Sequence, residues 1–588
     1  GGGMVWIKRR GPEAYTHRVF SPDLGSTAGG VYYHLDTTST SGKDDTTNQL
    51  TSFNSDGFSI GSNGHVSAWE RTFASWTFRK APRFFDVVTY AGNGVEGREI
   101  AHDLGVAPGM VIVKCTSHSQ TWTVYHRSTT GTHVGKLNLT NAFQDANYAW
   151  NDTDPTSTEF TVGITNVNQS GGTYVAYLFA HDPDGENDDG MIACGSYTGN
   201  GSTTGPVIDL GWEPQYVLIK KSSGSRDWLI FDTMRGITTG GVDPFLVANA
   251  SYAEESTARI ALNSTGFTAD TTSDDVNTSG STFIYMAIRS PMMVEPEAGT
   301  EVFAIDRYDG STSLPSWKSG FVTDMAYSRD GSTFNYGFMG SRLTGQESMQ
   351  PNATGAGTNN SYRLWDYMNG YYNRTNTNTN DLAYMFKRAK GFFDVVAYTD
   401  TNWAGVTINH SLGVIPEMMW LKQRDAGGTE WSVYHSALPN TSVPRLNRSN
   451  APEINQTRWS STDPTDTVFY TSESGGSYIV YLFATLSGVS KVGNYTGNGS
   501  NQNIACGFSA GARFVMIKRT DSSGGWYIWD TERGIVNGND PHFSLNTGAA
   551  EVTSDDSIDP QSAGFTVNQV SATNINVSSA SYIFLAIA

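Results

Sequence analysis

The chain has 588 residues, of which 12% are aromatic and 16% charged, and its formal net charge is −19. This length exceeds what one hydrophobic core supports and predicts several domains, while the acidic balance argues against nucleic acid or an anionic membrane surface as a partner. The three cysteines, Cys115, Cys194 and Cys506, are too few for a disulfide scaffold, so we expect free, mostly buried thiols.

Strand-like segments fill the chain from its beginning. Short alternating runs bounded by Gly, Asn, Asp and Ser predict strands joined by tight turns at residues 5–8, 31–35 and 56–60. No window approaches the ~20 apolar residues of a membrane span, so we expect no membrane insertion.

A duplication organises the chain. Residues 84–90 (FFDVVTY) return at 392–398 (FFDVVAY), residues 122–126 (WTVYH) return at 431–435 (WSVYH), and residues 228–236 return at 526–534. Within each half, a Gly-x-x-Pro turn, a strand ending in lysine and a Trp-bearing strand also recur, and the lysines are Lys114, Lys220, Lys422 and Lys518.

These repeats predict an all-β fold, a tandem array of about six small β-sandwich-like modules arranged as a duplicated three-module half. The predicted boundaries are 1–82, 83–187, 188–293, 294–390, 391–488 and 489–588. The last three modules are read as copies of the first three.

The first module is expected to lack a strand. Its copy carries a strand-like stretch at residues 302–306 upstream of Gly320–Val322, which we align with Gly3–Val5. A missing strand leaves a sheet edge bare, so the natural chain is expected to extend upstream of Gly1.

Residues 182–190 place five acidic side chains among Gly and Pro. Such a segment could hold calcium, but its spacing departs from the EF-hand pattern. Its counterpart, residues 485–488, is short and uncharged, so a solvated linker is favoured.

Trp228, Asp232 and Arg235 recur as Trp526, Asp530 and Arg533. A carboxylate and a guanidinium could await a ligand, but pairing at a strand end to hold the following Gly236 turn explains both copies.

His126 and His435 end the Trp-bearing strands. Neither has a second ligand at metal spacing, so structural histidines are favoured over metal ligands.

The chain has no P-loop, HExxH or CxxC motif. We therefore assign no catalytic, cofactor-binding or metal residue and expect no enzyme and no cofactor. A pair of carboxylates for glycoside cleavage and exposed aromatic side chains for sugar stacking stay open alternatives.

The run at residues 76–88 (WTFRKAPRFFDVV) resembles one found in bacteriophage virion proteins, as do residues 104–114, 228–236 and 283–288. The resemblance covers essentially the whole chain. It implies a large repetitive protein of the virion exterior, of the kind found in marine and environmental phages and described as tail-fibre or structural proteins.

The expected function is therefore a tail fibre, spike or other host-contacting appendage that acts by multivalent binding. The alternatives are a non-enzymatic capsid decoration or tail-nozzle scaffold and a polysaccharide-depolymerising spike. The expected partners are other virion proteins, a host surface glycan or protein, and the chain itself as a homo-oligomer, with a trimer favoured.

Overall fold

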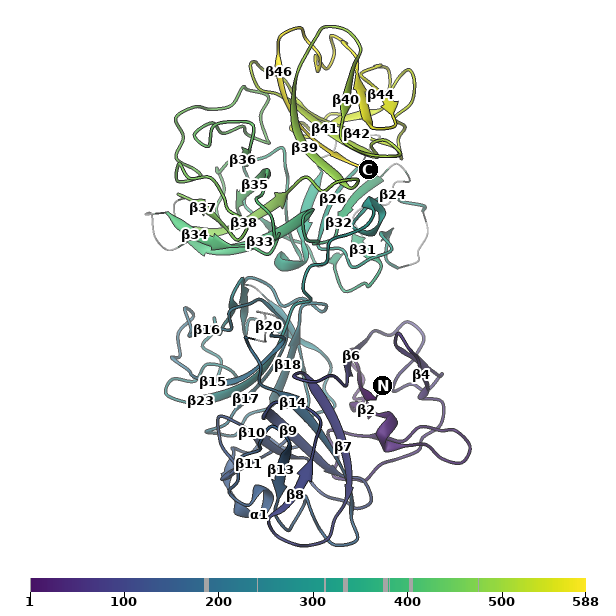
Figure 1. The fold of residues 1–588 in the computed structure, drawn as a ribbon, viewed down its shortest axis with the longest axis vertical. Helices are drawn as coiled ribbons and strands as arrows, with labels where there is room; N and C mark the ends of the chain where they lie inside the picture. Colours follow the sequence, from purple (N-terminus) through teal and green to yellow (C-terminus); the bar gives the residue numbers. More distant parts are fainter. Residues whose placement is uncertain are drawn as a thin grey trace. The chain divides into compact units, whose positions relative to one another are not determined.

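The computed structural model describes residues 2–184, 190–240, 242–310, 314–330, 337–373, 379, 381–400, 405–473 and 475–588. The chain divides into two compact units, Gly1–Pro291 and Met292–Ala588, each described here by itself (Figure 1). Strands make up 41% and helices 2% of the structure, which confirms the predicted all-β class.

Each unit contains three modules, where a module means one main antiparallel sheet with its small companion sheet or hairpin. The modules are numbered 1 to 6 in chain order. The strand orders below apply to the described residues.

The first unit holds modules 1, 2 and 3. Module 1 has the sheet β3(His34–Leu35)-β2(Arg18–Phe20)-β1(Gly3–Arg9)-β6(Phe73–Arg79), the hairpin β4(Leu50–Phe53)-β5(Phe58–Ile60) and the 3-10 helix η1(Pro22–Leu24). Module 2 has β12(Gln144–Asp145)-β11(His133–Lys136)-β10(Thr123–His126)-β9(Pro108–Cys115)-β14(Thr173–Ala180)-β7(Phe85–Ala91), with β13(Glu159–Val162)-β8(Arg98–Ala101) and the helix α1(Asn147–Trp150). Module 3 has β15(Ile192–Thr198)-β23(Thr282–Arg289)-β17(Pro214–Lys221)-β18(Trp228–Asp232)-β19(Asp243–Val247)-β20(Glu255–Thr257), with β16(Val207–Asp209)-β22(Gly266–Thr268)-β21(Ala261–Asn263).

The second unit holds modules 4, 5 and 6. Module 4 has β24(Phe303–Arg307)-β32(Asp381–Phe386)-β26(Met325–Asp330)-β27(Phe338–Ser341)-β28(Glu347–Met349)-β29(Thr358–Asn359), with β25(Trp317–Lys318)-β31(Gly370–Asn373)-β30(Arg363–Leu364) and the 3-10 helices η2(Gly299–Glu301) and η3(Arg342–Thr344). Module 5 has β33(Phe393–Asp400)-β38(Gly476–Phe483)-β35(Met418–Gln423)-β36(Ser432–His435), with β34(Val406–Asn409)-β37(Val468–Thr471). Module 6 has β39(Ser490–Thr496)-β46(Ser581–Ile587)-β41(Phe514–Arg519)-β42(Trp526–Asp530)-β43(His542–Ser544), with β40(Gln502–Ala505)-β45(Gly564–Val567)-β44(Ile558–Gln561).

The two units repeat one design, as the sequence duplication predicts. The order β10-β9-β14-β7 of module 2 returns as β36-β35-β38-β33 in module 5, and β19-β18-β17-β23-β15 of module 3 returns as β43-β42-β41-β46-β39 in module 6. The register agrees as well, since Lys114 pairs with Val175 on β14 and Lys422 with Ile479 on β38.

The register of module 4 corrects one predicted alignment. Met4 pairs with Phe78 in module 1 and Met325 pairs with Phe386 in module 4, so β1 corresponds to β26 and not to Gly320–Val322. Because a strand's register decides which side chains face the core, the true offset is the one that buries Met4 and Met325 alike.

The expected extra strand of module 4 is present as β24, which pairs with β32 through Phe303 and Phe386. Strands β7, β15, β33 and β39 take the same place in their own modules. Within the described residues, β6 of module 1 pairs with β1 alone.

The core of the first unit runs through all three of its modules without a break. All eight residues of β9 are buried, because one face of its sheet packs on the companion sheet and the other faces neighbouring modules. Phe78 of module 1 packs edge-on against Phe179 of module 2 and Tyr216 of module 3, with ring centroids 5.4 and 6.1 Å apart. Each module thus completes the core of the other two.

This shared core predicts where the chain can be divided. Residues 1–291 and 292–588, expressed separately, should each unfold cooperatively, because each retains its three modules and the aromatic contacts that join them. Residues 1–187 serve as the comparison, and should be unfolded or aggregated because Phe78 loses its packing against Tyr216. Thermal unfolding followed by circular dichroism checks this, and a cooperative transition in the 1–187 fragment would contradict it.

Candidate functional site

A buried cation lies at the same place in each of the six modules. The side chains are Lys8, Lys114, Lys220, Arg329, Lys422 and Lys518, all between 0% and 1% exposed. Burial lowers the pKa of each of the five lysines to about 8. A buried ammonium is tolerated only where hydrogen-bond acceptors replace water.

The acceptors are backbone carbonyls of a neighbouring module. In module 2, Lys114 Nζ donates to Thr40 O of module 1 at 2.8 Å, and in module 3, Lys220 Nζ donates to Thr140 O of module 2 at 2.8 Å. Each amine also donates to a carbonyl of its own module.

Module 1 closes the circle. Lys8 Nζ donates to Tyr252 O of module 3 at 2.8 Å, so each module of the first unit holds the one before it and the first holds the third. The second unit repeats this, with Lys422 on Thr354 O, Lys518 on Ser449 O and Arg329 on Ser544 O and Ala549 O. Each unit is therefore a closed ring of three modules.

Ring nitrogens beside the cations follow the same circuit. Trp122 Nε1 donates to Asp36 O, Trp228 Nε1 to Lys136 O, Trp431 Nε1 to Gln350 O and Trp526 Nε1 to Arg445 O, at 2.9 to 3.0 Å. In module 1 the same position holds His17, whose Nε2 lies 2.9 Å from Val247 O. The recurring tryptophans are thus part of the ring closure.

Asp232 and Arg235 form the predicted pair at the end of β18. Arg235 Nε donates to Asp232 Oδ2 at 2.6 Å, and Gly236 follows with a φ of 116°. Asp232 Oδ2 also accepts from Trp76 Nε1 of module 1 at 3.0 Å, a contact the sequence did not indicate.

Asp530 and Arg533 repeat the arrangement in the second unit, where Tyr384 OH of module 4 donates to Asp530 at 2.7 Å. Both Asp–Arg pairs therefore help to join modules of their ring.

The two predicted histidines are buried at the interface between neighbouring modules. His126 Nε2 lies 3.0 Å from Tyr285 O of module 3, and burial lowers the pKa of His126 to about 4. Burial likewise lowers the pKa of His435 to about 4, against the opposing effect of the carbonyls of Phe584 and Gly493.

Cys115, Cys194 and Cys506 are free and buried, as predicted. Asp182 of the acidic linker pairs with Arg83, and residues 185–189 lie outside the described residues. Among the residues that the structure describes, no group of three His, Cys, Asp or Glu could hold a metal ion. In the same part of the chain, no helix is long and apolar enough to cross a membrane.

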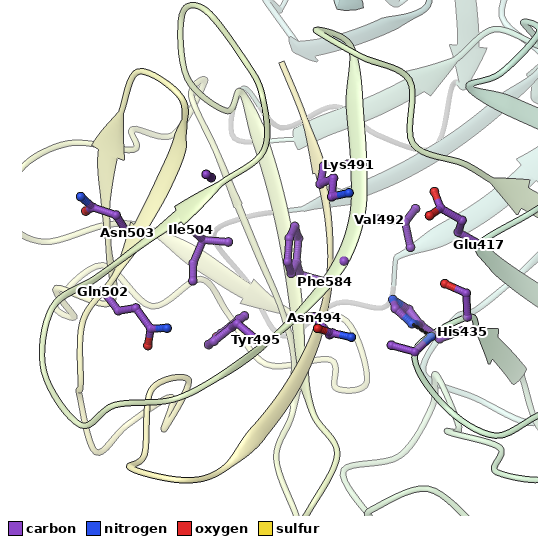
Figure 2. A pocket seen from close by; sticks show the side chains of 14 residues that line it. Glu417, His435, Lys491, Val492, Asn494, Tyr495, Gln502, Asn503, Ile504 and Phe584 are labelled. Carbon is purple, nitrogen blue, oxygen red and sulfur yellow. Dashed lines mark hydrogen bonds between the residues drawn. The ribbon is translucent and has the colours of Figure 1, made fainter.

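A hollow of about 550 Å³ lies between modules 5 and 6 (Figure 2). Module 5 contributes Glu417, just before β35, and His435 to Ala437 at the end of β36. Module 6 contributes β39, β40 and Phe584 on β46. In the order of strands, β39 and β40 are each at the edge of a sheet, so the hollow is bordered by two strand edges.

The polar side chains that line the hollow lie on two sides of Phe584. In Figure 2, Lys491 and Glu417 lie on one side of Phe584, and Gln502 and Asn503 lie on the other. A side chain on Gly493 would place Cβ 2.6 Å from the Phe584 ring, so the glycine allows that ring to fill the floor.

The equivalent place in the first unit carries different side chains. Gly109 stands where module 5 has Glu417, and a Cβ at Gly109 would lie 2.6 Å from the Cβ of Cys194. Arg127 stands where module 5 has Ser436 and donates to Cys194 O across the interface at 3.4 Å. The two equivalent interfaces thus differ, and Ser436 in the second unit is smaller than Arg127 in the first.

A second hollow, of about 350 Å³, lies between modules 1 and 2 and is lined by Asp23, Lys43, Thr116 and Tyr174 among others. Lys43 Nζ is already engaged, donating to Leu24 O at 2.8 Å and lying 3.9 Å above the Tyr33 ring. In the second unit Arg424 stands at the position of Thr116 and pairs with Glu347.

The family described as Domain of unknown function (DUF7483) matches residues 2–291 and again residues 325–588, so the chain belongs to that family. Each match covers most of one unit, and the second begins at Met325, after β24 and β25. No curated protein matches the chain.

The buried lysines predict a stability effect. Replacing Lys220 by Met should lower the free energy of unfolding by about 1–3 kcal/mol, because the carbonyls of Thr140 and Arg226 lose their donor. Lys221→Met, on the same strand, is the matched control and should cost less than about 0.5 kcal/mol. Urea unfolding measures both, and equal losses would contradict the ring contact.

The buried histidines predict a loss of stability in acid. With a folded pKa of about 4 against about 6.5 unfolded, His126 contributes stability that is complete above pH 6.5 and is lost as the pH falls toward 4. The loss reaches up to about 3 kcal/mol. Urea unfolding at pH 7 and pH 4.5 checks this, with His126→Gln, which cannot titrate, as the comparison. A pH dependence unchanged by the substitution would count against this assignment.

Proposed function

We propose that this member of the DUF7483 family is a structural protein of a virus particle, located on the particle exterior, that contacts the host by multivalent binding. The resemblance of residues 76–88 and three further segments to bacteriophage virion proteins supports this proposal.

The binding part of the proposal rests on the division of the polar side chains between two roles. The buried cations, the ring nitrogens and the Asp–Arg pairs join modules, which suits a rigid scaffold. Polar side chains with remaining hydrogen-bonding capacity line the hollow between modules 5 and 6. A rigid support with an open polar hollow favours binding over turnover.

The same hollow argues for binding rather than glycan cleavage. Glycosidases place two carboxyl groups about 5–9.5 Å apart across the scissile bond. Glu417 is the one carboxylate among the residues that line this hollow. The depolymerase alternative therefore has less support than the adhesin. The second alternative is a capsid-decoration or tail-nozzle scaffold, which the cell-binding test below distinguishes from an adhesin.

Multivalency would arise from assembly. A homo-oligomer, with a trimer favoured, would present several copies of the hollow, and weak sites joined on one scaffold gain avidity by effective concentration. Other virion proteins are proposed as its attachment partners.

The proposal predicts that purified full-length protein binds host cells without shortening their surface polysaccharide, and that light scattering gives an oligomer mass at micromolar concentration. Labelled protein on cells and size analysis of the extracted glycan are the measurements. If the glycan is shortened, the protein is a depolymerase and the adhesin proposal is wrong. Absence of cell binding would leave the scaffold role, and a monomer would remove the avidity argument.

A further inference from the structure

We propose that the hollow between modules 5 and 6 binds an acidic sugar, whose carboxylate pairs with Lys491 and whose hydroxyls bond to Gln502, Asn503 and Glu417. The site itself rests on the geometry of modules 5 and 6. Only the source of the sugar, a host surface glycan, rests on the proposed function.

Lys491 supplies the charge that selects an anion. It lies on β39, is partly exposed, and has no ion-pair or hydrogen-bond partner among the described residues. Lys518, on β41 of the same sheet, donates its amine hydrogens to Ser449 O and Gly524 O. The Lys491 amine thus keeps its donors for a ligand, and a carboxylate is the ligand group that forms charge-assisted hydrogen bonds with it.

The amide side chains suit hydroxyl groups. Gln502 Nε2 donates to Thr496 O at 3.1 Å, which fixes the side chain while its Oε1 is buried without a partner in this part of the structure. Asn503 Oδ1 accepts from Thr566 Oγ1 at 2.8 Å, which leaves its amide hydrogens available. A sugar hydroxyl both donates and accepts, so it can satisfy either group.

Glu417 favours a ligand with hydroxyl groups over a phosphate. Its Oε2 accepts from Thr485 N at 2.6 Å, which holds the carboxylate at the rim and leaves Oε1 as an acceptor. A hydroxyl can donate to that oxygen, whereas a dianionic phosphate would be repelled by it. One negative charge with several hydroxyls therefore fits better than a phosphate.

The size and lining agree with a small polar ligand. A volume of about 550 Å³ lies within the range of roughly 300–1,000 Å³ for small-molecule pockets. Backbone groups at the edges of β39 and β40 add further donors and acceptors.

Isothermal titration of the full-length protein with glucuronate, and with glucose as the neutral probe, tests the site. Glucuronate should bind at least about tenfold more tightly than glucose. Lys491→Ala should lose that preference and Lys491→Arg should retain it. Asn503→Ala should weaken glucuronate about fivefold, while Val207→Ala, at the equivalent position of the first unit, should leave binding unchanged.

A second variant tests the hollow without removing its polar groups. Ser436→Arg restores the arginine found at position 127 in the first unit, so the fold should accept it, and it should abolish glucuronate binding by filling the space. Circular dichroism and thermal unfolding confirm that each variant is folded.

The outcomes separate the site from the proposed function. No binding of glucuronate, or equal binding by Lys491→Ala, overturns the site. If the Ser436→Arg protein still binds cells, the hollow is not the host contact. The proposed role as an appendage then stands. Glucuronate binding by a protein that does not bind cells supports the site and overturns the proposed host contact.

Discussion

The structure depends on one buried cation in each module and on the backbone carbonyls that receive it. An ammonium group removed from water is strongly unfavourable unless acceptors surround it. Lys114, Lys220 and Lys8 find part of that shell in the preceding module of their ring. No module of the first unit can therefore satisfy its own lysine alone, and this requirement favours closure into a ring over an open row.

Closure also explains the distribution of aromatic side chains. The recurring tryptophans donate to carbonyls of the neighbouring module, and Phe78 contacts both Phe179 and Tyr216. A row of separate modules would expose these faces to solvent and to association. In the ring these side chains are buried.

One interface differs between the two rings. Arg127 and Cys194 meet across the interface of modules 2 and 3, whereas Ser436 and Val492 occupy those positions in the second unit and a hollow results. Modules 5 and 6 keep the contacts of Lys518 and Trp526 with backbone carbonyls of module 5. The second interface therefore holds without the contact that Arg127 makes in the first unit. This separation of scaffold from open surface suits a protein whose role is contact.

The sequence by itself determined the all-β class, the duplication into two halves of three modules, the pairing of Asp232 with Arg235 and the buried free cysteines, because these follow from local periodicity and from repeats that a single chain displays. It also marked the recurring lysines at 114, 220, 422 and 518 without indicating their acceptors. Those acceptors are backbone carbonyls of another module, and a carbonyl leaves no trace in residue type. The alignment of Gly320–Val322 with Gly3–Val5 was wrong, because short apolar runs match at several offsets and only strand pairing sets Met4 against Met325. The hollow was likewise decided by tertiary structure alone, since Glu417, Lys491 and Gln502 are distant in sequence and meet only where two modules of the ring pack together.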